Sequence, residues 1–240
     1  MHIGMATVVG ALSLWLDAGI AWADEEGQKK AKTGEPTAQD KAEAGKEGDK
    51  DKEAKDWVSL VPEKGMGDWK HIAFGGEGDT TWKDGVLTIG EGAELSGLVW
   101  GGALPKAPYE IELEARRTSG VDFFCGLTLP VRSDKNCVTF VVGGWGGGVV
   151  GVSSIDGLDA SENTTTKFMA FKDDQWYKIR LQVRKNHLAA WIGDEQTADE
   201  DTTGKELGLR FGDIDRCVPL GLATFQTKAE VRGFRWRPLK

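Results

Sequence analysis

From residue 57 to the end of the chain, short runs of apolar and polar positions are separated by turn residues. The clearest run is YEIELEARR at 109–117, where every second side chain is apolar. This period of two is typical of an antiparallel strand with one buried face. The other segments expected to contain strands are 57–61, 66–74, 81–90, 95–100, 175–195 (a hairpin turning at Lys185-Asn186), 218–226 and 229–239.

Residues 196–210 are expected to form a loop that includes at most a short helical turn. No segment has the period of a long amphipathic helix. About a dozen short strands with regular turns predict an all-β protein, an antiparallel β-sandwich or jelly roll, over residues 57–240.

The most distinctive stretch spans residues 122–157, where two apolar runs flank the polar turn RSDKN. The second run continues into GGWGGGVVGVSSIDG, in which Trp145 is the one large side chain among five glycines. The β-branched and aromatic residues of both runs predict covered, central strands. Trp145 is either a core plug over a bend, which we favour because large aromatic residues are mostly buried, or a flat platform for a ligand.

The chain begins with features of an export signal. Residues 3–23 are mostly apolar and end in Ala21-Trp22-Ala23, an A-x-A cleavage site. We predict a signal peptide at 1–23, cleaved after Ala23, and a secreted or periplasmic protein; an uncleaved membrane anchor is the alternative. Residues 24–56 contain no aromatic residue, Val, Ile or Leu, and predict a disordered charged linker.

Composition narrows the classes of partner. The formal charge of −8 argues against a nucleic-acid partner, and beyond the N-terminal segment no stretch is long and apolar enough to cross a membrane. The three cysteines do not form a disulfide framework. Cys125 and Cys137 should lie offset on neighbouring strands, so we expect free, buried thiols there, and Cys217 should be an unpaired core residue.

Carboxylates on the alternating strand are one candidate for chemistry. Glu110, Glu112 and Glu114 share a face, and neighbours two positions apart on a strand are separated by roughly 7 Å. That separation suits the acid pair of a glycoside hydrolase. The favoured interpretation is nevertheless the solvent face of an amphipathic strand.

A polar loop follows the Gly-rich segment. Asp156 and Asp159 are candidate Ca²⁺ ligands, because calcium prefers clustered oxygen ligands, although such a loop is usually only solvated. Glu162 and Asn163 in the same loop are candidates for substrate binding. No other cofactor is indicated.

Charges around the central hairpin complete the candidate site. Asp122, paired with an arginine, would form either a structural clamp or part of a polar cleft. We take Asp122 and Asp156 as candidate catalytic residues, and Trp145, Arg132 and Arg116 as further substrate-binding candidates. The G-x-G-x-x-G at 146–151 leads into an apparent strand instead of a helix, so it does not indicate a dinucleotide site.

Five segments also carry a family resemblance. WVSL…MGDW, TWKDGVLTIG, YEIELEAR, QWYKIRLQVR and VRGFRWRPL are similar in order and spacing to the domain-of-unknown-function 1080 family, also called the 3-keto-disaccharide hydrolase or 3-keto-glucoside lyase/hydratase family. The resemblance covers nearly all of 57–239. It implies a concanavalin A-like jelly roll, and many members of the family are secreted by carbohydrate-degrading bacteria.

Several polar residues of the family pattern are replaced here. Phe124-Cys125-Gly126-Leu127 stands at the Asn-Ser-Gly-Ile strand, and Phe225-Gln226-Thr227-Lys228 lacks the family's His. The resemblance itself implies a carbohydrate ligand on a concave sheet face, with a keto-sugar or glycoside as substrate. The alternative is a non-catalytic jelly-roll module that binds a glycan or a protein.

Overall fold

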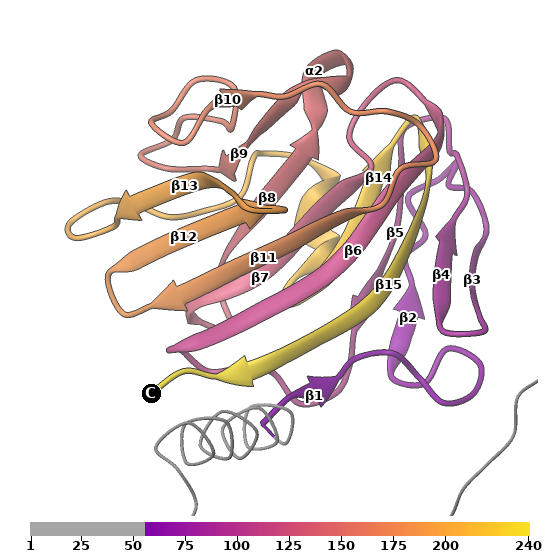
Figure 1. Cartoon of the computed structure of the whole chain (residues 1–240), viewed down its shortest axis with the longest axis horizontal. Helices are drawn as coiled ribbons and strands as arrows, with labels where there is room; N and C mark the ends of the chain where they lie inside the picture. The colour runs from indigo at the N-terminus through magenta and orange to yellow at the C-terminus, as the bar shows by residue number, and fades with distance from the viewer. Residues whose placement is uncertain (1–55) are drawn as a thin grey trace, which may run out of the picture. The chain divides into compact units, whose positions relative to one another are not determined.

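The computed structural model describes residues 56–240, which form two antiparallel sheets packed face to face (Figure 1). The eight-stranded sheet contains, in spatial order, β13 (Glu195–Asp201), β12 (His187–Ile192), β11 (Tyr177–Arg184), β6 (Tyr109–Gly120), β15 (Thr227–Pro238), β4 (Val86–Ile89) and β3 (Thr80–Lys83), with β1 (Val58–Ser59) paired to β15. The seven-stranded sheet contains β10 (Lys167–Phe168), β9 (Val149–Ser153), β8 (Asn136–Gly143), β7 (Cys125–Ser133), β14 (Gly221–Phe225), β5 (Leu95–Trp100) and β2 (Trp69–His71).

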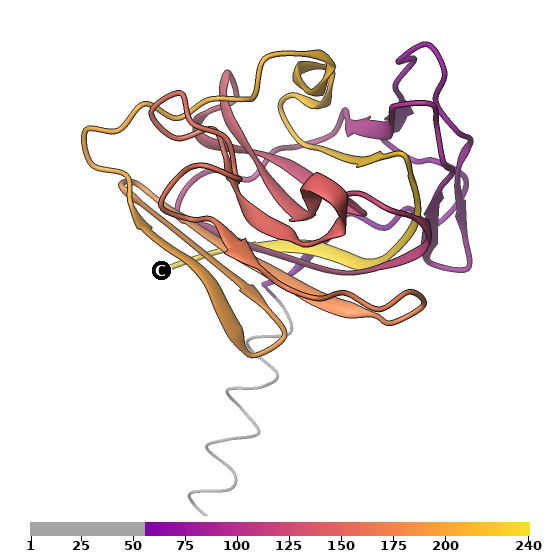
Figure 2. The same ribbon diagram turned by 90° about the horizontal axis from the view of Figure 1, so that it is seen from above.

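Two short helical turns lie outside the described strands. The turn α2 (Gly144–Gly147) connects β8 to β9, and the 3₁₀ turn η1 (Asp213–Cys217) precedes β14. Seen from above, η1 lies on the side of the seven-stranded sheet that faces away from the β11–β13 hairpins (Figure 2). The predicted all-β sandwich is thus confirmed.

The alternating strand behaves as its pattern predicts. The apolar side chains of β6 at Tyr109, Ile111, Leu113 and Ala115 are all buried between the sheets. They pack with the inward side chains of β7 and β8, such as Phe140, in one continuous core. Burial of this apolar surface is the main force that holds the two sheets together.

One element was predicted wrongly. Residues 196–201, which lie within the segment expected to be a loop, belong to the edge strand β13, which pairs with β12. Its sequence EQTADED is rich in residues that disfavour strands, but Thr197 and Ala198 are buried and a register shift falls opposite them. Pairing with β12 therefore stabilises this strand, although its own residues have low strand propensity.

The cysteine predictions are confirmed. Cys125 lies opposite Val142 and Cys137 lies opposite Pro130, so the two thiols are offset along the hairpin. Both, together with Cys217, are free and buried. Burial raises the pKa of the Cys125 thiol to about 12, and it raises the pKa of Cys217 to the same value. Such thiols are protonated at neutral pH and chemically inert.

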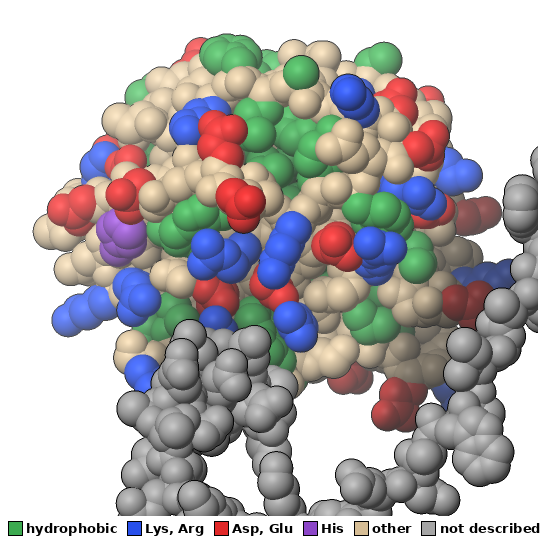
Figure 3. Space-filling view, viewed as in Figure 1, with side chains coloured by type: hydrophobic (Ala, Val, Ile, Leu, Met, Phe, Trp, Pro, Cys, Tyr) green, Lys and Arg blue, Asp and Glu red, His purple; other side chains and the backbone are tan. Residues whose placement is uncertain are grey.

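The outer face of the eight-stranded sheet carries a network of paired charges. Glu110 accepts hydrogen bonds from Gln182 (2.7 Å), Arg180 (3.2 Å) and Arg237 (2.9 Å). Glu112 and Glu114 are paired in the same way, with Arg235 and Lys178 and with Arg232 respectively. Basic and acidic side chains are intermingled across this face (Figure 3).

Tryptophan rings lie beneath several of these arginines. Arg180 stacks 3.8 Å from the Trp191 ring centre, Arg235 4.4 Å from Trp57, and Arg232 4.1 Å from Trp176. Glu110 and Glu112 are consequently buried, so the expectation that this face of the strand is simply solvated is corrected. With their oxygens committed to cations, the glutamates are unsuited to act as a hydrolytic acid pair.

The predicted signal peptide (1–23) and all but the last residue of the predicted linker (24–56) lie outside the described residues, and both remain predictions. In the described part of the chain, no helix is long and apolar enough to cross a membrane.

The Glu110 contacts predict a pH-dependent contribution to stability. Burial raises the pKa of Glu110, but the hydrogen bonds from Gln182 and Arg180 and the charge of Arg237 outweigh burial and lower it below 4.5. A lowered folded-state pKa stabilises the fold above pH 4.5, and this contribution is lost as the pH falls through that pKa. Glu110→Gln should therefore reduce the free energy of unfolding by about 1–3 kcal/mol at pH 7.

Urea unfolding at pH 7 and pH 3.5 measures this effect. The difference between the wild type and Glu110→Gln should be smaller at pH 3.5. Glu195→Gln, at an exposed ion pair, is the matched control and should change stability little. Equal effects of the two substitutions, or a difference that does not change with pH, would contradict the prediction.

Candidate functional site

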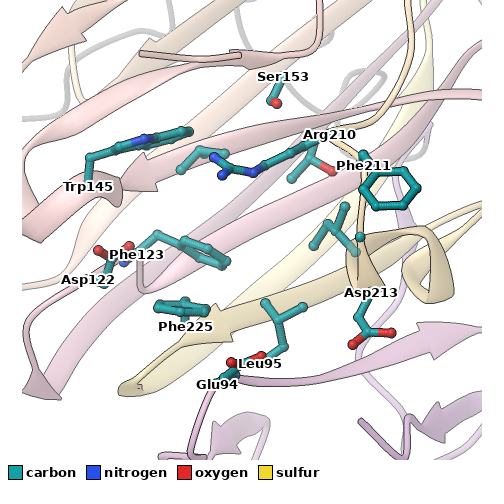
Figure 4. Close-up of a pocket in the computed structure, with 14 residues that line it drawn as sticks. Glu94, Leu95, Asp122, Phe123, Trp145, Ser153, Arg210, Phe211, Asp213 and Phe225 are labelled. Carbon is teal, nitrogen blue, oxygen red and sulfur yellow. Dashed lines mark hydrogen bonds between the residues drawn. The ribbon is translucent and has the colours of Figure 1, made fainter.

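A pocket of about 460 Å³ lies on the outer face of the seven-stranded sheet (Figure 4). Its floor is formed by Thr139 and Val141 of β8 and by Ser153 of β9. Its walls come from connecting segments: Trp145 of α2, the Phe123 region before β7, and residues 210–214 before and within η1. The sheet thus provides the base of the pocket, and loops provide most of its larger side chains.

Small side chains let other segments lie close to the outer face of this sheet. Strand pairing places one row of residues side by side across five strands, from β5 to β9. The row consists of Gly97, Ala223, Gly126, Val141 and Gly151. Since side chains alternate along strands, these positions face away from the core. Connecting segments lie directly over several of these small residues, such as Phe123 over Gly126 and Ala160 over Gly151, and Val141 is the member of the row that lines the pocket.

One glycine of this row allows an aromatic ring to lie on the sheet. A Cβ atom at Gly126 would come within 2.9 Å of the Phe123 ring. The ring of Phe123 stacks on Phe225 with 6.1 Å between ring centres. The Gly126 position therefore permits an aromatic wall along one side of the pocket.

Trp145 is the most exposed of the chain's described tryptophans, with 41% of its surface accessible. Its backbone is left-handed (φ 49°, ψ 54°), which is uncommon for a residue with a large side chain. Gly143, Gly146 and Gly147 also have positive φ, so the five-glycine segment forms a left-handed turn. The core-plug interpretation was wrong: the glycines present Trp145 at the edge of the pocket.

Asp122 fixes this turn in place. One carboxylate oxygen accepts the backbone N–H of Gly146 (2.8 Å), and the other accepts the N–H of Phe123 (2.8 Å). The backbone N–H of Asp122 donates to the Thr227 hydroxyl (3.0 Å). Asp122 is thus a structural clamp that also lines the pocket, and the clamp partners are backbone N–H groups in place of the arginine that we expected.

Arg210 lies over the pocket and was not predicted from the sequence. Its guanidinium pairs with Asp159 (3.0 Å) and lies 5.5 Å from the ring centre of Trp145. Asp159 also accepts a hydrogen bond from Ser153 (3.2 Å). The predicted metal ligand Asp159 therefore positions a cation beside the exposed tryptophan.

The other candidates of the polar loop lie outside the pocket. Asp156 accepts the backbone N–H of Glu206 (2.8 Å) and joins two loops. The Asn163 amide donates to the carbonyl groups of Val152 (2.7 Å) and Leu158, which shapes its own loop, whereas the Glu162 side chain is exposed. Among residues 56–240, no group of three or more His, Cys, Asp or Glu residues could hold a metal ion, so the calcium expectation has no ligand set there.

The two predicted arginines also lie elsewhere. Arg132 donates to the carbonyl groups of Thr202 (2.8 Å) and Lys205, and it lines a different surface hollow. Arg116 pairs with Glu230 (2.6 Å) on the outer face of the eight-stranded sheet. Of the predicted site residues, the structure therefore brings together Asp122 and Trp145, with Asp159 behind Arg210.

Three carboxylates line the pocket, and they differ in their surroundings. Asp122 holds two backbone N–H groups, as described above, and Asp213 pairs with Arg216 (3.2 Å). Glu94 is exposed, and no side-chain partner contacts its carboxylate within the described part of the chain. Arg210 is the cation of the pocket lining.

The chain is thus a two-sheet antiparallel jelly roll with a pocket on the outer face of the seven-stranded sheet. A family model, described as the 3-keto-alpha-glucoside-1,2-lyase-like domain, matches residues 56–235. The chain belongs to this family, and the resemblance seen in the sequence is confirmed. A search of curated proteins found no match.

Solved structures share the fold at low sequence identity. A predicted glycosyl hydrolase from Parabacteroides distasonis is 11% identical, covers 79% of this chain and 97% of its own, and has a TM-score of 0.52. The carbohydrate-binding module CBM66 from Bacillus subtilis is 10% identical, with coverage of 71% and 95% and a TM-score of 0.50. The Crh5 transglycosylase in complex with NAG is 10% identical, with coverage of 77% and 84% and a TM-score of 0.52.

The clamp at Asp122 predicts a local change in hydrogen exchange. In Asp122→Asn an NH₂ group replaces one acceptor oxygen, so at least one of the two backbone hydrogen bonds is lost. Loss of roughly 1.4 kcal/mol should accelerate amide exchange in residues 143–149 about tenfold. Hydrogen–deuterium exchange mass spectrometry measures this rate. Asp134→Asn, in the exposed turn between β7 and β8, is the control, and unchanged exchange at 143–149 in Asp122→Asn would contradict the clamp.

Proposed function

We propose that the protein processes a carbohydrate and binds a glycoside in the pocket beside Trp145. One observation carries the proposal: a tryptophan held in a left-handed turn exposes its ring at the edge of a preformed cavity. Strained backbone that is fixed by surrounding contacts is characteristic of functional sites. A core residue or a simple turn would not require this arrangement.

The pocket dimensions and chemistry suit one sugar ring with a substituent. Its volume of about 460 Å³ lies within the range of small-molecule sites. The face of an indole ring offers a flat apolar surface for the C–H groups of a pyranose. Arg210 lies beside that surface and can donate hydrogen bonds to hydroxyl or keto oxygens at the ring edge. The remaining lone pairs of the Asp122 oxygens can accept hydrogen bonds from hydroxyl groups.

Membership of the family suggests a 3-keto-glucoside as the substrate class and elimination as the reaction. In such a sugar the C3 ketone acidifies the hydrogen on C2. A base removes this proton, a double bond forms between C1 and C2, and the C1–O bond to the substituent breaks; the departing oxygen then takes up a proton. We propose Asp122 as the base, because each of its oxygens retains a lone pair and it lies beside Trp145.

A non-catalytic glycan-binding module is the second candidate. The observation that favours it is that both oxygens of Asp122 already accept backbone hydrogen bonds, so the carboxylate has a structural role in holding the turn. Both candidates use the same pocket and the same tryptophan. They differ in whether the bound glycoside is consumed.

Binding is tested at Trp145. Trp145→Ala should weaken binding of a methyl 3-keto-α-glucoside at least tenfold, because truncating a tryptophan at the centre of a binding site typically costs about 2 kcal/mol or more. Isothermal titration calorimetry measures the affinity. Trp176→Ala, which removes a tryptophan from the opposite sheet, is the matched control and should leave affinity unchanged. If the two variants bind equally, the ligand does not lie on Trp145.

Turnover separates the two candidates. Elimination creates a conjugated enone, so the wild type should cause an increase in ultraviolet absorbance with the 3-keto-glucoside. Asp122→Asn should lower kcat by about 100-fold or more at saturating substrate, which is the usual loss when a general base is removed. Asp213→Asn is the control, because its carboxylate already pairs with Arg216. Binding without any enone would support the binding module instead.

A further inference from the structure

We infer that the glycoside bound in this pocket carries an aromatic group as its C1 substituent. The inference rests on the proposed function and specifies the class of glycoside. Its basis is an unequal distribution of polar and apolar groups between the two sides of the pocket.

Asp122 and Arg210, which can hydrogen-bond a sugar ring, lie at the side of Trp145, and Glu94 lies at the opposite rim. Figure 4 shows Trp145 and Arg210 on one side of the pocket, and Phe225 and Leu95 on the other, with Phe123 between them. The Arg210 guanidinium is partly exposed and uses one nitrogen for Asp159, so its other N–H groups can reach a ligand. A sugar ring with several hydroxyl groups fits at this side.

Several other polar side chains of the lining are already satisfied by the protein. The Thr139 hydroxyl shares a 2.8 Å hydrogen bond with Thr128, and the Ser153 hydroxyl donates to Asp159. Asp213 pairs with Arg216. These side chains therefore offer little to a second sugar, whose hydroxyl groups would lose their hydrogen bonds to water, and Glu94 at the rim is the carboxylate of the lining that has no side-chain partner.

The opposite side of the pocket is an apolar wall. Phe123 stacks on Phe225, and Phe123, Leu95 and Ile214 pack against a small apolar cluster separate from the main core. Two polar side chains lie next to this wall: Glu94, which is exposed at the rim, and Asp213, which pairs with Arg216. Phe211, also in the lining, is fully exposed. An aromatic ring placed here would stack on Phe225 and cover apolar surface that otherwise faces water.

This wall also explains the small residues beneath it. Gly126 allows Phe123 to lie flat on the sheet, since a side chain at that position would displace the ring. An aromatic substituent at C1 then extends from the sugar over Phe123 towards Phe225. An aryl glycoside matches both sides of the pocket, whereas a disaccharide would place its second ring of hydroxyl groups on the apolar wall.

Affinities of the purified full chain for three probes test the inference: methyl 3-keto-α-glucoside, phenyl 3-keto-α-glucoside and a 3-keto disaccharide. The phenyl compound should bind at least about tenfold more tightly than either of the others, as expected for one additional stacked ring. Phe225→Leu should reduce the preference for phenyl over methyl at least about threefold and leave the affinity for the methyl compound within twofold. Phe168→Leu removes an exposed ring outside the pocket and should leave the preference unchanged.

The outcomes distinguish the inference from the proposed function. If the methyl and phenyl compounds bind equally, or the disaccharide binds most tightly, the pocket still binds a glycoside but the aromatic assignment is wrong. If none of the three probes binds, the proposed function fails, and the inference fails with it. The wild-type comparison requires no variant, so a Phe225→Leu protein that does not fold would not obscure the result.

Discussion

The pocket depends on the hydrogen bonds of a single carboxylate. Asp122 connects the segment before β7 to the turn between β8 and β9, and its backbone N–H is held by Thr227 at the start of β15. Without these bonds the left-handed backbone of Trp145, which costs about 1–3 kcal/mol, would have little to fix it. The position of the exposed indole is therefore set by a contact between two loops, and the glycines remove steric barriers to the turn.

The two outer sheet faces differ in what they leave available. On the eight-stranded sheet, each carboxylate of the row on β6 is matched by a cation, and several arginines cover tryptophan rings. Those side chains satisfy one another. On the seven-stranded sheet, small residues let connecting segments lie close to the sheet, and these segments place aromatic side chains and a cation around the pocket. Tryptophan and arginine occur on both faces, and only their packing separates a structural role from a binding role.

Local pattern predicted the fold well and the site only in part. The alternation in β6, the hairpin at Lys185-Asn186 and the offset of Cys125 and Cys137 depend on short-range rules, and these predictions were confirmed. Strand β13 was missed because its stability comes from pairing with β12 instead of from its own residues. Trp145 was named as a candidate, but its preferred interpretation was wrong, because the large number of glycines indicated a bend without indicating its handedness.

Site residues contributed by distant loops were beyond the reach of local pattern. Arg210 is about 65 positions from Trp145 in the chain, and the salt bridge to Asp159 that brings them together has no signature in the sequence. Conversely, Arg116 and Arg132 lie near the central hairpin in sequence, yet the strands carry them to other surfaces. In a β-sandwich, closeness along the chain does not predict which residues share a site, because adjacent strands often come from distant segments.

The strands themselves limit what this pocket can do. On β7, Cys125, Leu127 and Leu129 face the core, which leaves Gly126 and Thr128 on the outer face. That strand therefore contributes no ionisable group to the pocket, and the charged groups come from the segments outside the strands, such as Asp122 and Arg210. The floor consists of small side chains, and its hydroxyl groups already form hydrogen bonds within the protein. Changes in the connecting segments can therefore alter what binds without disturbing the sheet. The sandwich supplies a rigid surface, and the chemistry of this protein resides in the loops placed over it.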